Sequence, residues 1–433
     1  MTPQFSFMVL ATVIANRQAE LRELLLSMNQ TSGDANPANS IVPFAQIQRL
    51  HFARFVILDD GTSADISVYG LPAPAYPVYL AFLGEYDGPA EDIFYLFEQH
   101  GAPGLKRIFS FCTEFSTVTN LEVWMKAHSV RPATMYINQR GRTMHSVREN
   151  AAVYDALELF LASHSETLRV LPSTVIFERS KTFIFGEAQA GRLALSHEET
   201  TPFGWRVKNL LHLFGIPLVI LLISSLLIVY APFFLLQLWW HERSDPEITP
   251  RVSLDHANVL AHIEDRDCTN QFSAFGSVKP GLFRRWTLIF ILWLIEYTTQ
   301  HIYHRGRLAR VSTIHFARWV WLDDKKRLFF ASNYDGSLEA YMDDFINKVF
   351  FGLNAVFSNG IGYPTTRWLV SKGATDELKF KYYIRRHQLP TEVWYNAHPG
   401  LTALTMQRNE RIRQGIEKSS MTKAEASAWL DLL

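Results

Sequence analysis

The chain has 433 residues, of which 48% are hydrophobic, so it is long enough for two or three domains with substantial cores. Its 42 Lys and Arg residues balance 42 Asp and Glu residues, so there is no overall field to attract nucleic acid or acidic lipid in particular. Only Cys112 and Cys268 are present, which excludes a disulfide framework and fits a reducing compartment.

The N-terminal region is predicted to form a strand and then an amphipathic helix. Residues 5–14 are largely apolar and lack both a basic region and a small-residue cleavage site, which favours a strand over a signal peptide. Leucines then recur at helical spacing over residues 19–28.

An uncharged apolar segment occupies the middle of the chain. Residues 210–240 contain no Asp, Glu, Lys or Arg, and this length exceeds the roughly 20 residues of a membrane-spanning helix. Arg206 and Lys208 precede it, and Trp239 and Trp240 end it as interfacial aromatic residues do. A membrane segment is therefore favoured over a buried core helix.

Two parts of the chain repeat the same motifs in the same order. The stretches "QRLHFARFVILDD" (48–60) and "YLAFLGEYDG" (79–88) return within "STIHFARWVWLDDKKRLFFASNYDG" (312–336). In both parts a strand and a helix precede the motif, and a helix and a further strand, "LKRIFSFC" or "LNAVFSN", follow it. This order is the ferredoxin-like pattern, so the sequence predicts an α+β protein with two tandem ferredoxin-like units.

Each predicted unit ends in a helix–strand–helix tail, with strands in "RPATMYINQRG" and "LPTEVWYNAHPG". The expected organisation is a first unit with its tail at 1–165, a connector at 166–208, a membrane-inserted segment at 209–241, a second connector at 242–268, and a second unit with its tail at 269–433.

The two units are expected to pack together, which bears on how the apolar segment meets the membrane. A single crossing would separate the units, whereas a hairpin or re-entrant segment keeps both on one side, here expected to be the cytoplasmic side. Gly215, Pro217 and Pro232 are possible breaks. Residues 286–295 are too short to span and are interpreted as a packed helix whose outer face touches lipid.

The repeated strands carry a histidine and an arginine. Alternation along a strand places His315 and Arg318 on opposite faces, and likewise His51 and Arg54. One face is covered by helices and the other by a second sheet, so either the histidine or the arginine points between the sheets. A buried arginine needs a partner, for which the Asp of each Tyr-Asp-Gly motif is a candidate. A structural ion pair and a functional role both remain open.

Other polar clusters indicate no chemistry. The Asp-Asp pairs at 59–60 and 323–324 are interpreted as hairpin turns. The acidic run around His262 matches no metal-ligand spacing, and no metal site is expected.

The string Gly84-Glu85-Tyr86-Asp87-Gly88 matches the Gly-x-x-Asp-Gly motif on the distal side of the haem in dye-decolourising peroxidases. With both units placed, the chain resembles the dimeric α+β barrel superfamily, which also includes chlorite dismutases and cofactor-free monooxygenases. The resemblance implies that the two sheets pack face to face as an intrachain barrel. Residues 332–336 depart from the motif, reading Ser-Asn-Tyr-Asp-Gly. A haem would need an axial histidine on a helix, for which His387 is the candidate.

The chain is also similar to bacterial membrane proteins of uncharacterised activity that share "TIHFARWV", "SNYDGS" and "GLNAVFSN". Three classes of function remain open. The first is a haem-dependent, peroxidase-like oxidoreductase acting on a lipophilic substrate. Its catalytic residues would be Asp335, Arg318, Asp87 and Arg54, and its cofactor-binding residues His387, His315, Tyr334 and Asn333.

The second class is a cofactor-free enzyme or binding protein for an apolar or lipid ligand held between the sheets. The residues proposed to line that site are Phe316, Trp319, Trp321, Tyr334, Trp394 and Tyr395. The third class is a non-enzymatic membrane scaffold. Membrane lipid is an expected partner in all three.

Overall fold

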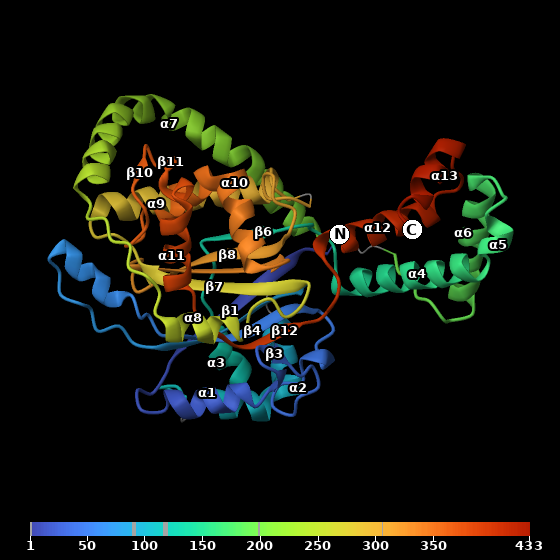
Figure 1. The fold of residues 1–433 in the computed structure, drawn as a ribbon, viewed down its shortest axis with the longest axis horizontal. Coiled ribbons are helices and arrows are strands. Elements are labelled where there is room, and N and C mark those ends of the chain that lie inside the picture. Colours follow the sequence, from blue (N-terminus) through green and yellow to red (C-terminus); the bar gives the residue numbers. More distant parts are fainter. Residues whose placement is uncertain (1, 89–91, 116–119, 198–199, 305) are drawn as a thin grey trace.

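The computed structural model describes residues 2–88, 92–115, 120–197, 200–304 and 306–433. The protein is α+β, with two four-stranded antiparallel sheets and one long apolar helix (Figure 1). The predicted fold class is confirmed at this level, and the N-terminal segment forms a strand as expected.

The first sheet has the strand order β1 (Gln4–Thr12), β5 (Tyr79–Asp87), β4 (Leu50–Leu58) and β12 (Thr391–Asn396). One face packs against α1 (Gln18–Leu26), α2 (Asp92–Phe109) and α3 (Leu121–Ala127). Leu21 and Met125 from these helices share a buried cluster with Phe55 and Phe82 of the sheet. The helical leucine spacing of the sequence thus becomes the surface that covers this face.

The second sheet has the matching order β6 (Thr134–Ile137), β8 (Ile314–Leu322), β9 (Arg327–Asp335) and β7 (Thr269–Ser277). Its covering helices are α9 (Leu282–His301), α10 (Leu338–Phe357) and α11 (Glu377–His387). Each of these helices contributes to the buried cluster, for example through Leu288 of α9, Phe345 of α10 and Ile384 of α11.

The two sheets also share a buried apolar cluster of their own. Val56 and Leu83 of the first sheet lie in one cluster with Val320, Phe329 and Phe275 of the second. Each sheet therefore has one face on helices and part of the other in contact with its counterpart.

The fourth strand of each sheet is not the one expected from the sequence. "LKRIFSFC" and "LNAVFSN" lie largely in the last turns of α2 and α10. Leu105, Ile108 and Phe109 are all buried and have the i, i+3, i+4 spacing of a helix. The strand prediction for this segment is therefore wrong, because a short apolar run fits a strand and a buried helix equally well. The edge strand comes instead from the tail of the other half: β12 pairs with β4, and β6 pairs with β8.

A helical bundle projects to one side of the sheets (Figure 1). It contains α4 (Met144–Ser163), α5 (Ser165–Leu168), α6 (Ser173–Gln189), α12 (Ala403–Glu417) and α13 (Lys423–Leu430). Val153, Phe177, Ile412 and Trp429 form its core. The tails of both halves thus meet in one bundle.

Shorter elements complete the chain: β2 (Asn29–Thr31), β3 (Asp34–Ala35), β10 (Thr366–Arg367), β11 (Ser371–Lys372), α8 (Leu254–Ala261) and the 3-10 turns η1 (Phe44–Gln46), η2 (Ser63–Tyr69) and η3 (Gly373–Thr375). Asp323 and Asp324 form the predicted turn, both with positive φ. Asp59 and Asp60 do not form a hairpin turn, because η2 lies in the long connection between β4 and β5.

The apolar segment forms one helix, α7 (Phe203–Ser244), that runs through Gly215, Pro217 and Pro232. No turn interrupts it, so the predicted hairpin is replaced by a single continuous helix. Figure 1 shows α7 arching over α9 and α10. The segment at 286–295 forms part of α9, as predicted, with Leu288 and Leu292 buried.

Candidate functional site

The two repeated arginines reach from one sheet to the other. Arg54 on β4 donates hydrogen bonds to the carbonyl oxygens of Phe272 (2.9 Å) and Ser332 (3.0 Å) in the second sheet. Arg318 on β8 donates to the carbonyl oxygens of Phe7 (2.7 Å) and Gly84 (2.8 Å) in the first sheet. Each arginine is thus held by the sheet opposite its own.

Glu85 and Asn333, which immediately precede the two Tyr-Asp-Gly motifs, complete this contact. Glu85 accepts a hydrogen bond from Arg318, and its Oε2 lies 3.0 Å from Asn333 Nδ2. Asn333 in turn accepts a hydrogen bond from Arg54. The arginine partners are therefore Glu85 and Asn333, rather than the aspartates expected from the sequence.

This buried centre contains more positive than negative charge. Two guanidinium groups, 2% and 1% exposed, are served by one carboxylate, that of Glu85. Burial lowers the pKa of Arg54 to about 9; the charge of Arg318 acts in the same direction and that of Glu85 opposes it. The carbonyl oxygens around each arginine replace the missing second anion.

The aspartates of the two motifs pair with the repeated histidines. His51 Nε2 lies 2.9 Å from Asp87 Oδ1, and His315 Nε2 lies 2.7 Å from Asp335 Oδ1. The second oxygen of Asp87 accepts the N–H of Met144 at the start of α4. In the same way, Asp335 accepts the N–H of Ala403 at the start of α12. Each aspartate thus places a negative charge at a helix N-terminus and joins the end of a strand to the bundle.

A β-bulge changes the direction of the histidines. The pairing register shifts between Leu50 and Phe52 and between Ile314 and Phe316. In such a bulge two successive residues oppose one, so the simple alternation of faces fails. The His51 ring lies 5.5 Å from that of Phe316, which belongs to an aromatic cluster between the sheets. The prediction that histidine and arginine face opposite ways is therefore wrong, because both point toward the other sheet.

A third histidine, His398, lies beside these two and was missed by sequence reasoning. Its ring centroid is 5.9 Å from that of His315 and 6.1 Å from that of His51. Burial, with the two neighbouring histidines, lowers its pKa well below the usual value. His398 has no counterpart in the motif repeat, so the sequence held no signal for it.

The predicted catalytic residues are thus collected in one place but enclosed. All four are at most 8% exposed: Asp335, Arg318, Asp87 and Arg54. The arginines donate to backbone carbonyl oxygens of the opposite sheet, and the aspartates accept backbone N–H groups at the starts of bundle helices. Such an arrangement links the two sheets and the bundle. It offers a substrate no access to the carboxylates or guanidinium groups.

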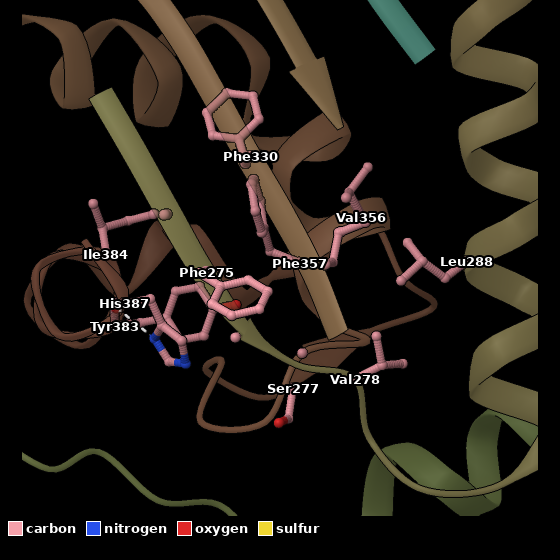
Figure 2. Close-up of a pocket in the computed structure, with 14 residues that line it drawn as sticks. Phe275, Ser277, Val278, Leu288, Phe330, Val356, Phe357, Tyr383, Ile384 and His387 are labelled. Atoms are coloured by element: carbon pink, nitrogen blue, oxygen red, sulfur yellow. Dashed lines mark hydrogen bonds between the residues drawn. The ribbon is translucent and has the colours of Figure 1, made fainter. Parts of the chain in front are cut away.

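His387, the candidate haem ligand, lies elsewhere. It is on α11, and its Nδ1 donates a hydrogen bond to the carbonyl oxygen of Tyr383 at 2.8 Å. Figure 2 shows His387 and Tyr383 across a small cavity from Leu288 and Val356. The cavity volume is about 30 Å³, which is enough for one water molecule.

The residues present do not fit a haem. The cavity beside His387 is far smaller than a porphyrin, and a Cβ on Gly276 would already lie 2.4 Å from the His387 ring. His315 is paired with Asp335 of its own sheet, and Asn333 with Glu85 of the opposite sheet. Tyr334 stacks on Tyr341 at 4.0 Å under the helices. The predicted cofactor residues are therefore not brought together around one space.

The aromatic residues proposed for a pocket between the sheets are also divided. Phe316 and Trp394 pack with Phe52 between the sheets, where Trp394 and Phe52 stack at 5.1 Å. Trp319 belongs to the helix-covered core of the second sheet and Tyr395 to that of the first. These side chains fill three separate cores and do not line a common pocket.

The helices α7 and α9 touch near both of their ends. His212 contacts His301 at 2.8 Å, and His241 stacks on Phe283 at 4.8 Å. Between these contacts α7 runs about 29 residues and α9 about 18, or roughly 44 and 27 Å of helix. The longer helix must therefore bow away from the shorter one, and Pro217 and Pro232 allow it to bend.

An apolar groove of about 830 Å³ opens between the C-terminal half of α7 and α9. Leu227, Tyr230 and Phe234 line it from α7, and Trp286 and Phe290 from α9. Trp286 is 64% exposed and Phe290 46%. This volume suits a small ligand or an acyl chain. The sequence indicated a lipid-facing side of α9 but not the groove, which depends on the bowing of α7.

The outer surface of α7 is also apolar and uncovered. Its most apolar 18 residues have a mean hydropathy of 2.6, and none of them is buried. By length and composition, α7 is the one helix among the described residues that is able to cross a membrane. An exposed apolar surface of this extent indicates contact with lipid or with another protein.

No group of three or more metal-ligating side chains occurs in the part of the chain that the structure describes. No protein-family model, curated protein or solved structure matches the chain significantly. The functional argument therefore rests on the residues and their geometry.

Proposed function

We propose that the protein is a monotopic membrane protein that binds a lipid in the groove between α7 and α9. The observation that carries this proposal is the 830 Å³ apolar groove beneath an exposed apolar helix. Trp286 and Phe290 in its lining are exposed, so a bilayer in contact with α7 would deliver an acyl chain to the groove.

The attachment of both ends of α7 supports a one-sided arrangement. At the start of the helix, Gln300 donates a hydrogen bond to Asn209 at 2.9 Å. At its end, Arg284 pairs with Asp245 at 2.7 Å, and Glu242 accepts the N–H of Leu369 at 2.8 Å. A straight crossing would have to break one set of contacts, whereas an arch dipping into one leaflet preserves both.

The finer architecture belongs to the same proposal. We infer that the two halves are copies of one ferredoxin-like unit that pack sheet to sheet as an intrachain α+β barrel. Two similarities support this: the sheets have matching strand orders, and the His–Asp and arginine contacts occur in each half. Both globular halves are proposed to lie on the cytoplasmic side, where free thiols such as Cys112 and Cys268 are stable.

A peroxidase-like activity is not part of this proposal, because the predicted residues do not fit a haem. The alternative of a scaffold without a ligand is separated from lipid binding by experiment. Lipid bound to the detergent-purified full-length chain would be identified by native mass spectrometry. Trp286→Glu places a charge in the groove and is expected to remove the bound lipid, since each buried methylene contributes about 0.8 kcal/mol.

The matched control is Leu159→Glu, which places the same charge at an apolar residue of α4 that is 72% exposed and outside the groove. It is expected to retain the lipid. Equal lipid occupancy in both variants, or no lipid in the unchanged protein, would favour the scaffold.

The one-sided arrangement is tested by cysteine labelling in vesicles. Gly204→Cys and Ser244→Cys, each in a chain without Cys112 and Cys268, report on the two ends of α7. Both sites are exposed. Equal labelling by an impermeant reagent is expected, and opposite protection of the two sites would exclude the arch.

A further inference from the structure

A second recess lies at the N-terminal end of α7 and has a different character from the apolar groove. Its volume is about 670 Å³, and it is bordered by α7, the end of α9, the turn between β6 and α4, and one side of α12. Its lining is rich in polar and basic side chains, including Arg140, Arg142, Arg411, His301 and Trp205.

Positive charge in this recess is only partly neutralised. Arg142 pairs with Glu410 at 2.8 Å. Arg140 has a buried Nε without a hydrogen-bond partner, and among the described residues it forms no salt bridge. Arg411 lines the same recess, also without a salt-bridge partner in the described chain, and is exposed. Among the described lining residues Glu410 is the one carboxylate, and it is already paired, so two guanidinium charges face this space without a counterion.

The titratable groups around the recess also indicate a positive electrostatic potential. Burial lowers the pKa of His301 to about 4, and His212, Arg140 and His304 act in the same direction. Burial also lowers the pKa of Arg140, with Glu296 opposing it. A bound anion would relieve the cost of holding these donors together. The zero net charge of the chain therefore conceals a local positive site.

The recess and the apolar groove lie along the same pair of helices. Gln300 borders the recess and Leu294 borders the groove, and six residues of α9, roughly 9 Å of helix, separate them. The recess is at the end of α7 where Arg206 and Lys208 precede the apolar run. A charged site at a helix end and an apolar groove along the helix together match an amphiphile with an anionic head.

We propose that the recess binds the phosphate of an anionic phospholipid, with Arg140 and Arg411 as its principal ligands and with an acyl chain of the same molecule in the apolar groove. This inference rests on the proposed lipid-binding function and names the class of lipid. Arg140 supplies a planar donor group that suits phosphate oxygens, and Arg411 adds a second charge from α12.

The test compares two lipids that share acyl chains. The full-length chain in detergent is titrated with dioleoylphosphatidylglycerol and with dioleoylphosphatidylcholine, and bound lipid is counted by native mass spectrometry. The anionic lipid is expected to bind at least about tenfold more tightly, and Arg140→Gln to abolish that preference. Arg140→Lys keeps the charge and should retain part of it. Arg169→Gln removes an exposed arginine outside the recess and should change nothing.

Each outcome separates the inference from the function on which it rests. If both lipids bind equally and Arg140→Gln has no effect, the headgroup site is refuted while lipid binding stands. If neither lipid binds to folded protein, the proposed function fails. Inorganic phosphate at millimolar concentration is the last arm: binding of phosphate that is as tight as that of the anionic lipid would assign the recess to a soluble anion and overturn the proposal.

Discussion

Glu85→Gln is the substitution that probes the contact between the sheets most directly. Glu85 is 3% exposed and is the carboxylate that serves both buried arginines, Arg318 by a salt bridge and Arg54 through Asn333. The substitution removes the charge and turns an amide N–H₂ toward either the Arg318 guanidinium or the Asn333 Nδ2. Breaking a buried ion pair from one side costs about 3 to 5 kcal/mol of unfolding free energy.

The measurement is the free energy of unfolding of the full-length protein in mild detergent, followed by tryptophan fluorescence in denaturant. Glu392→Gln is the matched control, because Glu392 is also buried but pairs with the half-exposed Arg22. Burial raises the pKa of Glu392, with Arg22 opposing. The folded state thus disfavours the charged carboxylate of Glu392. The contribution of this group to the free energy of unfolding is fully present below the pKa that it has in the unfolded chain, and is lost as the pH rises through its pKa in the folded protein.

At pH 7 Glu392→Gln is therefore expected to be neutral or slightly stabilising. A loss of less than about 1 kcal/mol in Glu85→Gln, or an equal loss in both variants, would refute the view that Glu85 holds the buried arginines in place.

Three further predictions follow from separate parts of the fold. The buried His398 has a lowered pKa, so unfolding takes up a proton below about pH 6.5. The free energy of unfolding should therefore fall as the pH drops from 7 to 5, by up to about 1.4 kcal/mol per pH unit. His398→Gln should flatten this pH dependence in thermal melts, and the same slope in both proteins would contradict the assignment. A Cβ at Gly104 would lie 1.9 Å from the carbonyl oxygen of Ile41, so Gly104→Ala should destabilise the protein by about 1 to 3 kcal/mol. In the same helix, a Cβ at Gly101 would have its nearest neighbours at 3.6 Å, an ordinary contact distance, so Gly101→Ala should stabilise by up to about 1 kcal/mol. Equal effects of the two substitutions in denaturant titrations would argue against the tight contact at Gly104. Protein expressed with added haem should show no stoichiometric Soret band or pyridine haemochrome, and a full complement of haem would show that the core around His387 rearranges.

Several features were predictable because their signals are local. Helical spacing of leucines indicated α1, and the length of the apolar run indicated a helix able to enter a membrane. The short apolar stretch at 286–295 was correctly assigned to a packed helix, since its position in the repeat outweighed its composition.

The candidate site was predictable only in part. Strand alternation left open whether the histidine or the arginine of each repeat points between the sheets, and the structure places Arg54 and Arg318 there. The choice of the aspartates as partners of the arginines was wrong, because a bulge turns each histidine toward the aspartate and leaves the arginine to Glu85 or Asn333. A bulge inserts one residue into the pairing, and no residue type at these positions announces it.

By itself, the sequence determined the α+β composition, the repeated strand motifs and the uncovered apolar helix, because each depends on residues close together in the chain. Only the tertiary structure decided that β6 and β12 exchange between the sheets, that α7 arches over α9, and that a basic recess and an apolar groove share those two helices. These features bring together residues hundreds of positions apart, and their geometry follows from strand register and from the unequal lengths of two packed helices. The periodicity of apolar residues within a strand or helix carries no information on how distant segments are arranged.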